Sequence, residues 1–145
     1  MFKHILIPTD GSDLSRKAVL YGVQLAKFTG ARVTALTIKA PYVVSSMDAI
    51  AVVGSQQQYE DEAAQYAERA LEQAQMAAEA AGVTLETLEE THDQPYRAII
   101  DAALANGCDL IVMASHGRRG VSALLLGSET NKVLTHSAIP VLVYR

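Results

Sequence analysis

The sequence predicts an α/β fold in which a five-stranded parallel sheet is doubly wound, with helices on both faces. Short apolar runs alternate with amphipathic stretches along the whole chain, which is typical of parallel sheets with right-handed crossovers. The fourth of these runs is almost wholly apolar, as expected of a strand that is covered on both faces. No linker or internal repeat divides the 145 residues, so we expect one domain over 1–145.

The first strand and the first helix are separated by a short polar loop. Phe2–Ile7 is an apolar-rich run that ends at Pro8, and Ser12 or Asp13 can cap a helix over Leu14–Phe28. A glycine ends this helix, and the next apolar run predicts the second strand. That strand and the apolar positions of the helix are expected at Ala31–Ile38 and at Ala18, Leu20, Tyr21, Val23, Leu25 and Ala26.

A long helix follows the least regular segment of the chain. Lys39–Gln58 is long for a connection inside a compact domain, so we expect it to be functional or mobile. Glu60–Ala81 is the clearest helix, because small apolar residues recur at helical spacing and Gly82 follows. A coiled coil is the alternative, although the stripe is mostly alanine. The stripe comprises Ala63, Ala67, Ala70, Leu71, Ala74, Ala77, Ala78 and Ala81.

The last third of the chain completes the alternation. Val83–Leu88 is expected to be the third strand, and Gln94–Ala105 a helix with a proline in its first turn. Asp109–Ala114 is the fourth strand. The final helix and strand are expected over Ser128–Thr135 and Ala138–Tyr144.

Composition argues against nucleic-acid and membrane partners. The formal net charge is −4 and Arg118–Arg119 is the only arginine pair, whereas nucleic-acid surfaces gather many basic residues. No apolar run approaches the ~20 residues of a membrane span. The apolar part of the amino terminus is too short for a signal peptide, so we expect a cytoplasmic protein. Cys108 is the single cysteine of the sequence, so no internal disulfide can form, and the scattered histidines suggest no metal site.

Two glycine-containing loops are expected to meet at one edge of the sheet. In open sheets of this kind, ligands bind beyond the carboxyl ends of the strands where strand order reverses. The order 3-2-1-4-5 would place Pro8–Ser12 beside the segment that follows Ala114. Glycines let backbone N–H groups approach a phosphate, and a helix start at Ser128 would add further donors. This edge therefore predicts an anion site, although it carries neither a P-loop nor a G-x-G-x-x-G motif.

Three stretches together resemble the universal stress protein family. They are Ile5–Ser12, then Ser115–Gly117 followed after nine residues by Gly127 and Ser128, and finally Ile139–Val143. The resemblance covers the whole chain and implies a domain of the adenine nucleotide α-hydrolase-like, Rossmann-like type, usually a homodimer. It also implies ATP binding in members that carry the glycine motif, whereas another branch lacks the motif and does not bind ATP.

One position departs from the family's ATP-binding pattern, which is G-x-x-G, nine residues, then G-[ST]. Gly117, Gly127 and Ser128 match it, but Ala114 stands where the first glycine is expected. If the backbone φ of this alanine is negative, the added methyl group is tolerable. If φ is positive, the alanine costs about 1 kcal/mol or more.

The resemblance also implies a role for individual residues. Asp10 would contact the ribose or help to hold a metal, Mg²⁺, on the phosphates; capping of the first helix is its alternative role. Ser128 can cap the last helix as well as contact phosphate, and His116 is more readily explained as a structural residue than as a catalyst. Arg118 would neutralise phosphate or be solvated. The implied nucleotide site comprises Pro8, Thr9, Asp10, Ile38, Met113, Ala114, His116, Gly117, Arg118, Gly127, Ser128 and Glu129.

Three functions remain open at this point. The first is a homodimeric regulatory module of the stress response that binds ATP and is not an enzyme. The second is a slow ATPase, for which Asp10 is the evident candidate group. The third is a dimer that binds no nucleotide, since Ala114 departs from the pattern. In each case the apolar edge strand Ala138–Tyr144 is expected to pair with a second copy.

Overall fold

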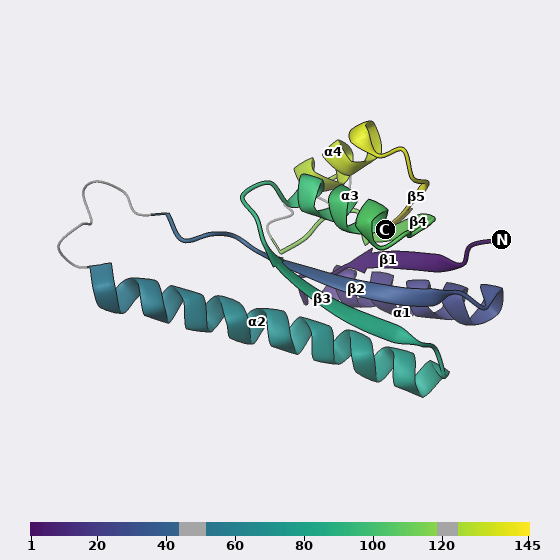
Figure 1. Cartoon of the computed structure of the whole chain (residues 1–145), viewed down its shortest axis with the longest axis horizontal. Coiled ribbons are helices and arrows are strands. Elements are labelled where there is room, and N and C mark those ends of the chain that lie inside the picture. The colour runs from purple at the N-terminus through teal and green to yellow at the C-terminus, as the bar shows by residue number, and fades with distance from the viewer. Residues whose placement is uncertain (44–51, 119–124) are drawn as a thin grey trace.

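Five parallel strands form one sheet in the order β3-β2-β1-β4-β5, which confirms the predicted fold class and strand order (Figure 1). The structure is a computed structural model that describes residues 1–43, 52–118 and 125–145. The strands are β1 (His4–Pro8), β2 (Arg32–Lys39), β3 (Leu85–Thr91), β4 (Leu110–Ala114) and β5 (Val141–Tyr144). The helices are α1 (Asp13–Thr29), α2 (Val52–Ala81), α3 (Pro95–Ala105) and α4 (Ser128–His136).

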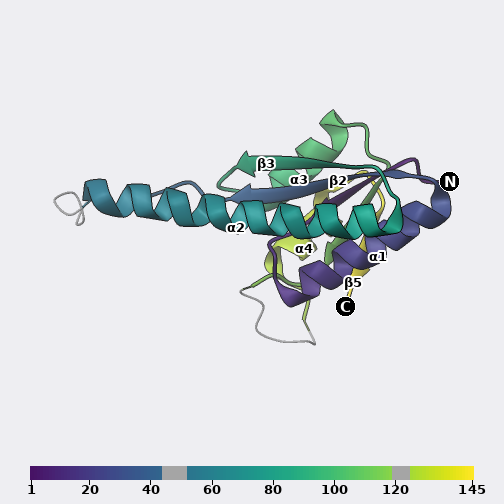
Figure 2. The same ribbon diagram turned by 90° about the horizontal axis from the view of Figure 1, so that it is seen from below.

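Each face of the sheet is covered by a pair of helices (Figures 1 and 2). Successive side chains of a strand point to opposite faces, so β1 supplies both cores. Ile5 and Ile7 pack with residues of α1 and α2, whereas Leu6 packs with Ile99 of α3 and Val133 of α4. The central strand is thereby buried on both faces, and its carboxyl end lies between the two layers of helices.

Helix α1 begins and ends where the sequence indicated, but two of its predicted core positions are exposed. Ser12 is the N-cap and accepts the Ser15 N–H, while Gly30 ends the helix with a φ of 73°. The buried positions are Ser15, Ala18, Val19, Gly22, Val23 and Ala26. Leu20 and Tyr21, predicted to be core residues, are 55% and 44% exposed because they lie outside the stripe that faces the sheet.

Helix α2 is longer than predicted. It begins at Val52 rather than Glu60, so the prediction of an irregular segment is wrong for its last residues, and residues 44–51 of that segment lie outside the described part. Its 30 residues span about 45 Å, and its first half projects past the carboxyl edge of the sheet (Figure 2). From Ala67 onward the alanine stripe is buried in the core, which explains the stripe without a coiled coil.

Two strand boundaries differ from the prediction for local reasons. Val83 donates its N–H to the Ala78 carbonyl across Gly82, so this valine completes the end of α2 and β3 begins at Leu85. The Ser137 hydroxyl and the Ile139 backbone bond each other in a turn, so β5 begins at Val141 rather than Ala138. Within the described residues, no helix has an apolar stretch long enough to cross a membrane.

Candidate functional site

The two predicted loops meet at the carboxyl ends of β1 and β4, and Asp10 joins them. Its Oδ1 accepts the Ser12 N–H at 2.9 Å, and its Oδ2 accepts the Arg118 N–H at 2.9 Å. A Cβ atom on Gly117 would lie 2.5 Å from that Oδ2. Only glycine therefore allows this carboxylate and the loop after β4 to approach so closely.

Asp10 is held in its ionised form. Burial raises the pKa of this carboxyl, but hydrogen bonds from Ser12, from the Arg118 N–H and from Ser15 outweigh that effect and leave the pKa below its ordinary value of 3.8. Each carboxylate oxygen accepts one N–H and has a lone pair left for a hydroxyl group or a metal ion. Because Ser12 caps α1, Asp10 is not needed as the helix cap.

Threonines fix the backbone of the loop after β1. The Thr9 N–H donates to the Leu36 carbonyl at 2.8 Å, and the Thr37 hydroxyl donates to the Thr9 carbonyl at 2.8 Å. The hydroxyl groups of Thr9 and Ser15 lie 3.1 Å apart. No sequence pattern was used to predict a role for Thr37. The feature that could have indicated it is a hydroxyl side chain near the end of a mostly apolar strand, where it is buried.

Ala114 causes no backbone strain at the end of β4. No residue other than glycine has a positive φ in the described ranges, so the alanine adopts an ordinary extended conformation. Its carbonyl accepts the Thr130 hydroxyl at 2.9 Å, and the next N–H, that of Ser115, donates to Tyr144 at 2.8 Å. The backbone at this position does not require the glycine of the family pattern.

The start of α4 presents backbone donors. Gly127, not Ser128, is the N-cap residue, and its N–H donates to the Ser115 carbonyl at 2.7 Å. A Cβ atom on Gly127 would lie 3.2 Å from both that carbonyl oxygen and the His116 Cα, so the backbones touch here. Among the described residues, no acceptor meets the N–H groups of Ser128 and Glu129. These two groups are free to bind an anion.

The carboxylate of Glu129 is engaged elsewhere. It accepts the Tyr96 N–H in the first turn of α3 at 2.9 Å and pairs with Lys132 at 3.1 Å. Its negative charge is therefore partly balanced by the ammonium group and by the start of α3. Only the backbone N–H of Glu129, the group that the sequence analysis singled out, belongs to the start of α4.

Arg118 contacts a residue that the sequence analysis did not include in the site. Its guanidinium carbon lies 4.5 Å from the centroid of the Tyr66 ring, on α2. This cation–π contact joins the loop after β4 to the long helix. Helical periodicity gave no sign of it, because Tyr66 is an exposed residue outside the apolar stripe. Arg119, its neighbour in the predicted pair, lies outside the described residues.

The remaining predicted residues lie at the same edge. Ile38 and Met113 belong to the apolar cluster under α3 and α4, at the carboxyl ends of the strands that flank β1, and half-buried Pro8 ends β1 itself. The Nδ1 of half-buried His116 lies 3.2 Å from the Ser115 hydroxyl. In the described ranges, no three histidine, cysteine, aspartate or glutamate side chains form a group that could hold a metal ion.

Comparison with known proteins points to one family across the full chain. The family model for the Universal stress protein family matches residues 1–145. Universal stress protein YxiE of Bacillus subtilis (strain 168) is 33% identical, and the match covers 100% of both chains.

Solved structures share the fold. The universal stress protein UspA from Lactobacillus plantarum has a TM-score of 0.84 at 28% identity, and the match covers 99% of this chain and 97% of that chain. A universal stress protein solved in complex with cAMP has a TM-score of 0.71 at 25% identity, covering 99% and 97% of the two chains.

Proposed function

Because the chain belongs to the universal stress protein family, we propose that it binds an adenine nucleotide where the loops after β1 and β4 meet. The observation that carries the proposal is the hydrogen bond from the Arg118 N–H to Asp10. This bond brings a carboxylate, a glycine loop and the start of α4 to the point where strand order reverses. The relative that was solved with cAMP supports an adenine nucleotide as the ligand.

Each group has a chemical role in this proposal. The N–H groups of Ser128 and Glu129 bind phosphate oxygens, and the backbone of Ile38, near the carboxyl end of β2, contacts the base. The free lone pairs of Asp10 accept a ribose hydroxyl or coordinate Mg²⁺ on the phosphates. ATP with Mg²⁺ is the proposed ligand, since a triphosphate offers more oxygens to these donors than a monophosphate does.

We further propose that the protein is a homodimer. β5 forms one edge of the sheet, and each of its residues is only half-buried. The Tyr144 ring packs against Tyr21 of α1 at 5.6 Å, and exposed Leu20 extends the same apolar surface. An edge strand with open backbone groups and apolar neighbours favours pairing with a second copy across a two-fold axis. Sedimentation at micromolar concentration tests this: a dimer is expected, and a monomer contradicts it.

We propose a regulatory binding role rather than catalysis. Hydrolysis would need a group that positions water near the terminal phosphate. Both oxygens of Asp10 already hold backbone N–H groups, which suits the carboxylate for binding and positioning. Phosphate release well above background that is abolished by Asp10→Ala would favour the slow ATPase instead.

Thermal unfolding with and without Mg-ATP tests the site. Ligand at ~100 times its dissociation constant should stabilise the protein by roughly 2.7 kcal/mol. Gly117→Val should abolish this shift, because its Cβ would displace the Asp10 carboxylate. Ala80→Val, at an exposed position near the end of α2 and outside the proposed site, is the control and should leave the shift unchanged.

The outcomes separate the remaining functions. No shift with the wild-type chain at millimolar Mg-ATP would support the dimer that binds no nucleotide. A shift that survives Gly117→Val would place the nucleotide elsewhere on the chain. An equal shift with Mg-GTP would contradict the choice of an adenine base.

A further inference from the structure

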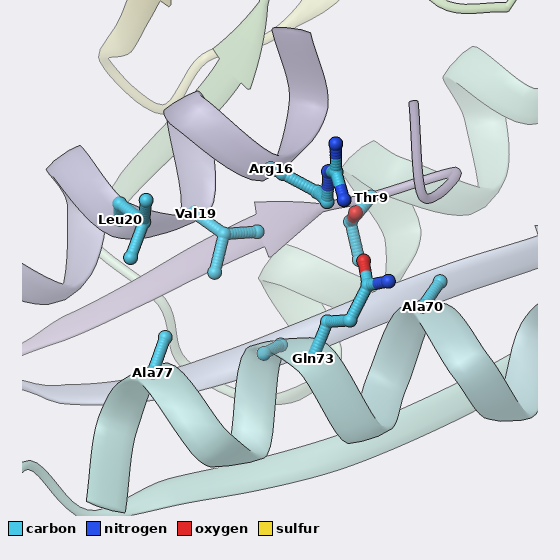
Figure 3. A pocket seen from close by; sticks show the side chains of 8 residues that line it. Thr9, Arg16, Val19, Leu20, Ala70, Gln73 and Ala77 are labelled. Carbon is cyan, nitrogen blue, oxygen red and sulfur yellow. The ribbon is translucent and has the colours of Figure 1, made fainter. Parts of the chain in front are cut away.

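A cavity of about 120 Å³ lies between α1 and α2 (Figure 3). Of the residues in the predicted nucleotide site, it contacts only Thr9, so it is a separate feature. It is lined by Thr9, Arg16, Val19, Leu20, Ala70, Gln73, Ala74 and Ala77.

The cavity is polar at one end and apolar at the other. Figure 3 shows the polar tips of Arg16, Thr9 and Gln73 close together, with Val19 and Leu20 further along the cavity. Such a lining suits a small molecule with a polar head and a short apolar body.

Small side chains on α2 keep this space open. Ala70, Ala74 and Ala77 lie on one face of the helix, at spacings of four and three residues. The cavity is partly open to solvent, because Arg16, Leu20 and Gln73 in its lining are exposed, so a small molecule can enter it. Leucine at Ala77 would fill space that the native sequence leaves empty. The open space therefore suits an occupant from outside the chain.

Arg16 and Gln73, at the polar end of the cavity, can form hydrogen bonds to a ligand. The guanidinium group of Arg16 pairs with Asp13, one turn earlier on α1; Asp13 is largely exposed and Arg16 is about half exposed. Surface ion pairs of this kind contribute little, so exchange for another carboxylate is inexpensive. The Gln73 amide has no hydrogen-bond partner among the described residues and adds a donor.

We propose that this cavity is a second ligand site, which binds a short-chain monocarboxylate. Its carboxylate meets Arg16 and Gln73, and its alkyl chain lies against Val19, Leu20 and Ala77. A cavity of 150 Å³ holds benzene, so about 120 Å³ admits a chain of roughly four carbons. The site does not require the nucleotide proposal, because neither Asp10 nor the start of α4 lines it.

Titration of the full chain with sodium butyrate tests the proposal. Alanine methyl NMR should show saturable shifts for Ala70 and Ala77. Butan-1-ol has the same chain length and no charge, and it should bind more weakly. Arg16→Gln should weaken butyrate binding a few-fold and leave butanol binding unchanged, since the ion pair with the carboxylate is lost at a partly exposed site.

Two variants complete the test. Lys17→Gln is the matched control, because it removes the same charge from the neighbouring position outside the cavity, and it should retain wild-type affinity. Ala77→Leu fills the cavity and should abolish binding of both ligands while the thermal melt shows a folded protein. The proposal is overturned if wild-type methyl signals do not shift, if Arg16→Gln binds butyrate as the wild type does, or if Ala77→Leu retains binding.

Discussion

The amino ends and the carboxyl ends of the parallel strands form two opposite edges of the sheet. At both edges an aspartate carboxylate binds backbone N–H groups, at least one of them from a distant segment, but the surroundings of the two carboxylates differ. Asp109 accepts the N–H groups of Lys3 and His4, and Asp10 accepts those of Ser12 in its own loop and of Arg118 in the loop after β4. In both cases these hydrogen bonds outweigh the effect of burial and lower the pKa of the carboxyl. A carboxylate that accepts backbone N–H groups therefore does not by itself distinguish the edge with the proposed site from the opposite edge.

The neighbours of each carboxylate make the difference. At the amino edge, His4 is buried with both ring nitrogens bonded, to the Asn106 carbonyl at 3.0 Å and the Thr34 hydroxyl at 2.7 Å. Burial also raises the pKa of the Cys108 thiol to about 11, so the thiol stays protonated at neutral pH. At the carboxyl edge, Gly117 is exposed, and the start of α4 has backbone donors without acceptors in the described residues. One edge is closed by its own groups and the other can accept a ligand.

The largest expected contrast comes from removing each carboxylate. Asp109→Ala should lower the free energy of unfolding by about 2 kcal/mol, because charged hydrogen bonds to two backbone groups are lost. Asp10→Ala should cost less stability but remove the stabilisation by Mg-ATP. Urea unfolding with and without nucleotide measures both. Loss of nucleotide binding in Asp109→Ala, with the protein still folded, would contradict the division between the edges.

Sequence patterns predicted the sheet better than they predicted the site's contacts. Alternation of elements and the glycine loops were sufficient for strand order and for placing Asp10 beside Gly117, because both depend on chain topology. Contacts between distant exposed residues left no periodic signal. The packing of Arg118 on Tyr66 became visible only when α2 was placed in space.

The predicted starts of β3 and α2 were wrong for a similar reason, because hydropathy alone does not reveal them. Val83 is apolar and lies two residues before Leu85, so a strand that begins at Val83 fitted the hydropathy pattern. The structure assigns its N–H to the carboxyl end of α2, a hydrogen bond that hydropathy does not encode. Likewise, residues 55–60 in the first turns of α2 are exposed and mostly polar, and they had no apolar stripe to reveal a helix.

Substitution of a glycine by alanine should mainly lower stability at the amino edge and mainly weaken nucleotide binding at the carboxyl edge. Gly107 has a φ of 65° and nothing within 4 Å of an added Cβ, so Gly107→Ala should cost about 1 kcal/mol of stability and spare nucleotide binding. Gly127 has a negative φ and close backbone contacts, so Gly127→Ala should mainly weaken Mg-ATP binding. Calorimetry of the two variants measures both effects. Equal affinities would show that the contact at Gly127 does not shape the site.

His4 should make stability depend on pH at the closed edge. Burial, the largest cause, and the charge of Arg32 lower the pKa of His4 below its ordinary value of 6.5. The unfolded chain therefore takes up a proton at higher pH than the folded chain does, so stability is lost as pH falls below about 6.5. The effect is small near neutral pH and grows toward acid.

Denaturant unfolding across the pH range from 7.5 to about 5 measures the slope. His4→Gln should flatten it, whereas His136→Gln, at an exposed position near the end of α4, should not. An unchanged slope in His4→Gln would assign the acid sensitivity to other groups. Nucleotide affinity should follow neither substitution, because His4 lies at the edge opposite to the proposed site.

The smallest expected effect concerns the negative charge of Glu129 at the carboxyl edge. It tests whether this charge weakens nucleotide binding even though the carboxylate bonds Tyr96 and Lys132. Glu129→Gln keeps an acceptor for the Tyr96 N–H but loses the charge that pairs with Lys132 and the start of α3. Stability should fall by about 0.5 kcal/mol, since the pair is partly exposed. Mg-ATP should bind a few-fold more tightly, because a carboxylate one residue from the proposed phosphate donor Ser128 repels phosphate. Calorimetric titration with Mg-ATP and Mg-ADP measures the change, which should be larger for the more highly charged nucleotide. Weaker binding in Glu129→Gln would mean that the carboxylate orders the start of α4 more than it repels the ligand.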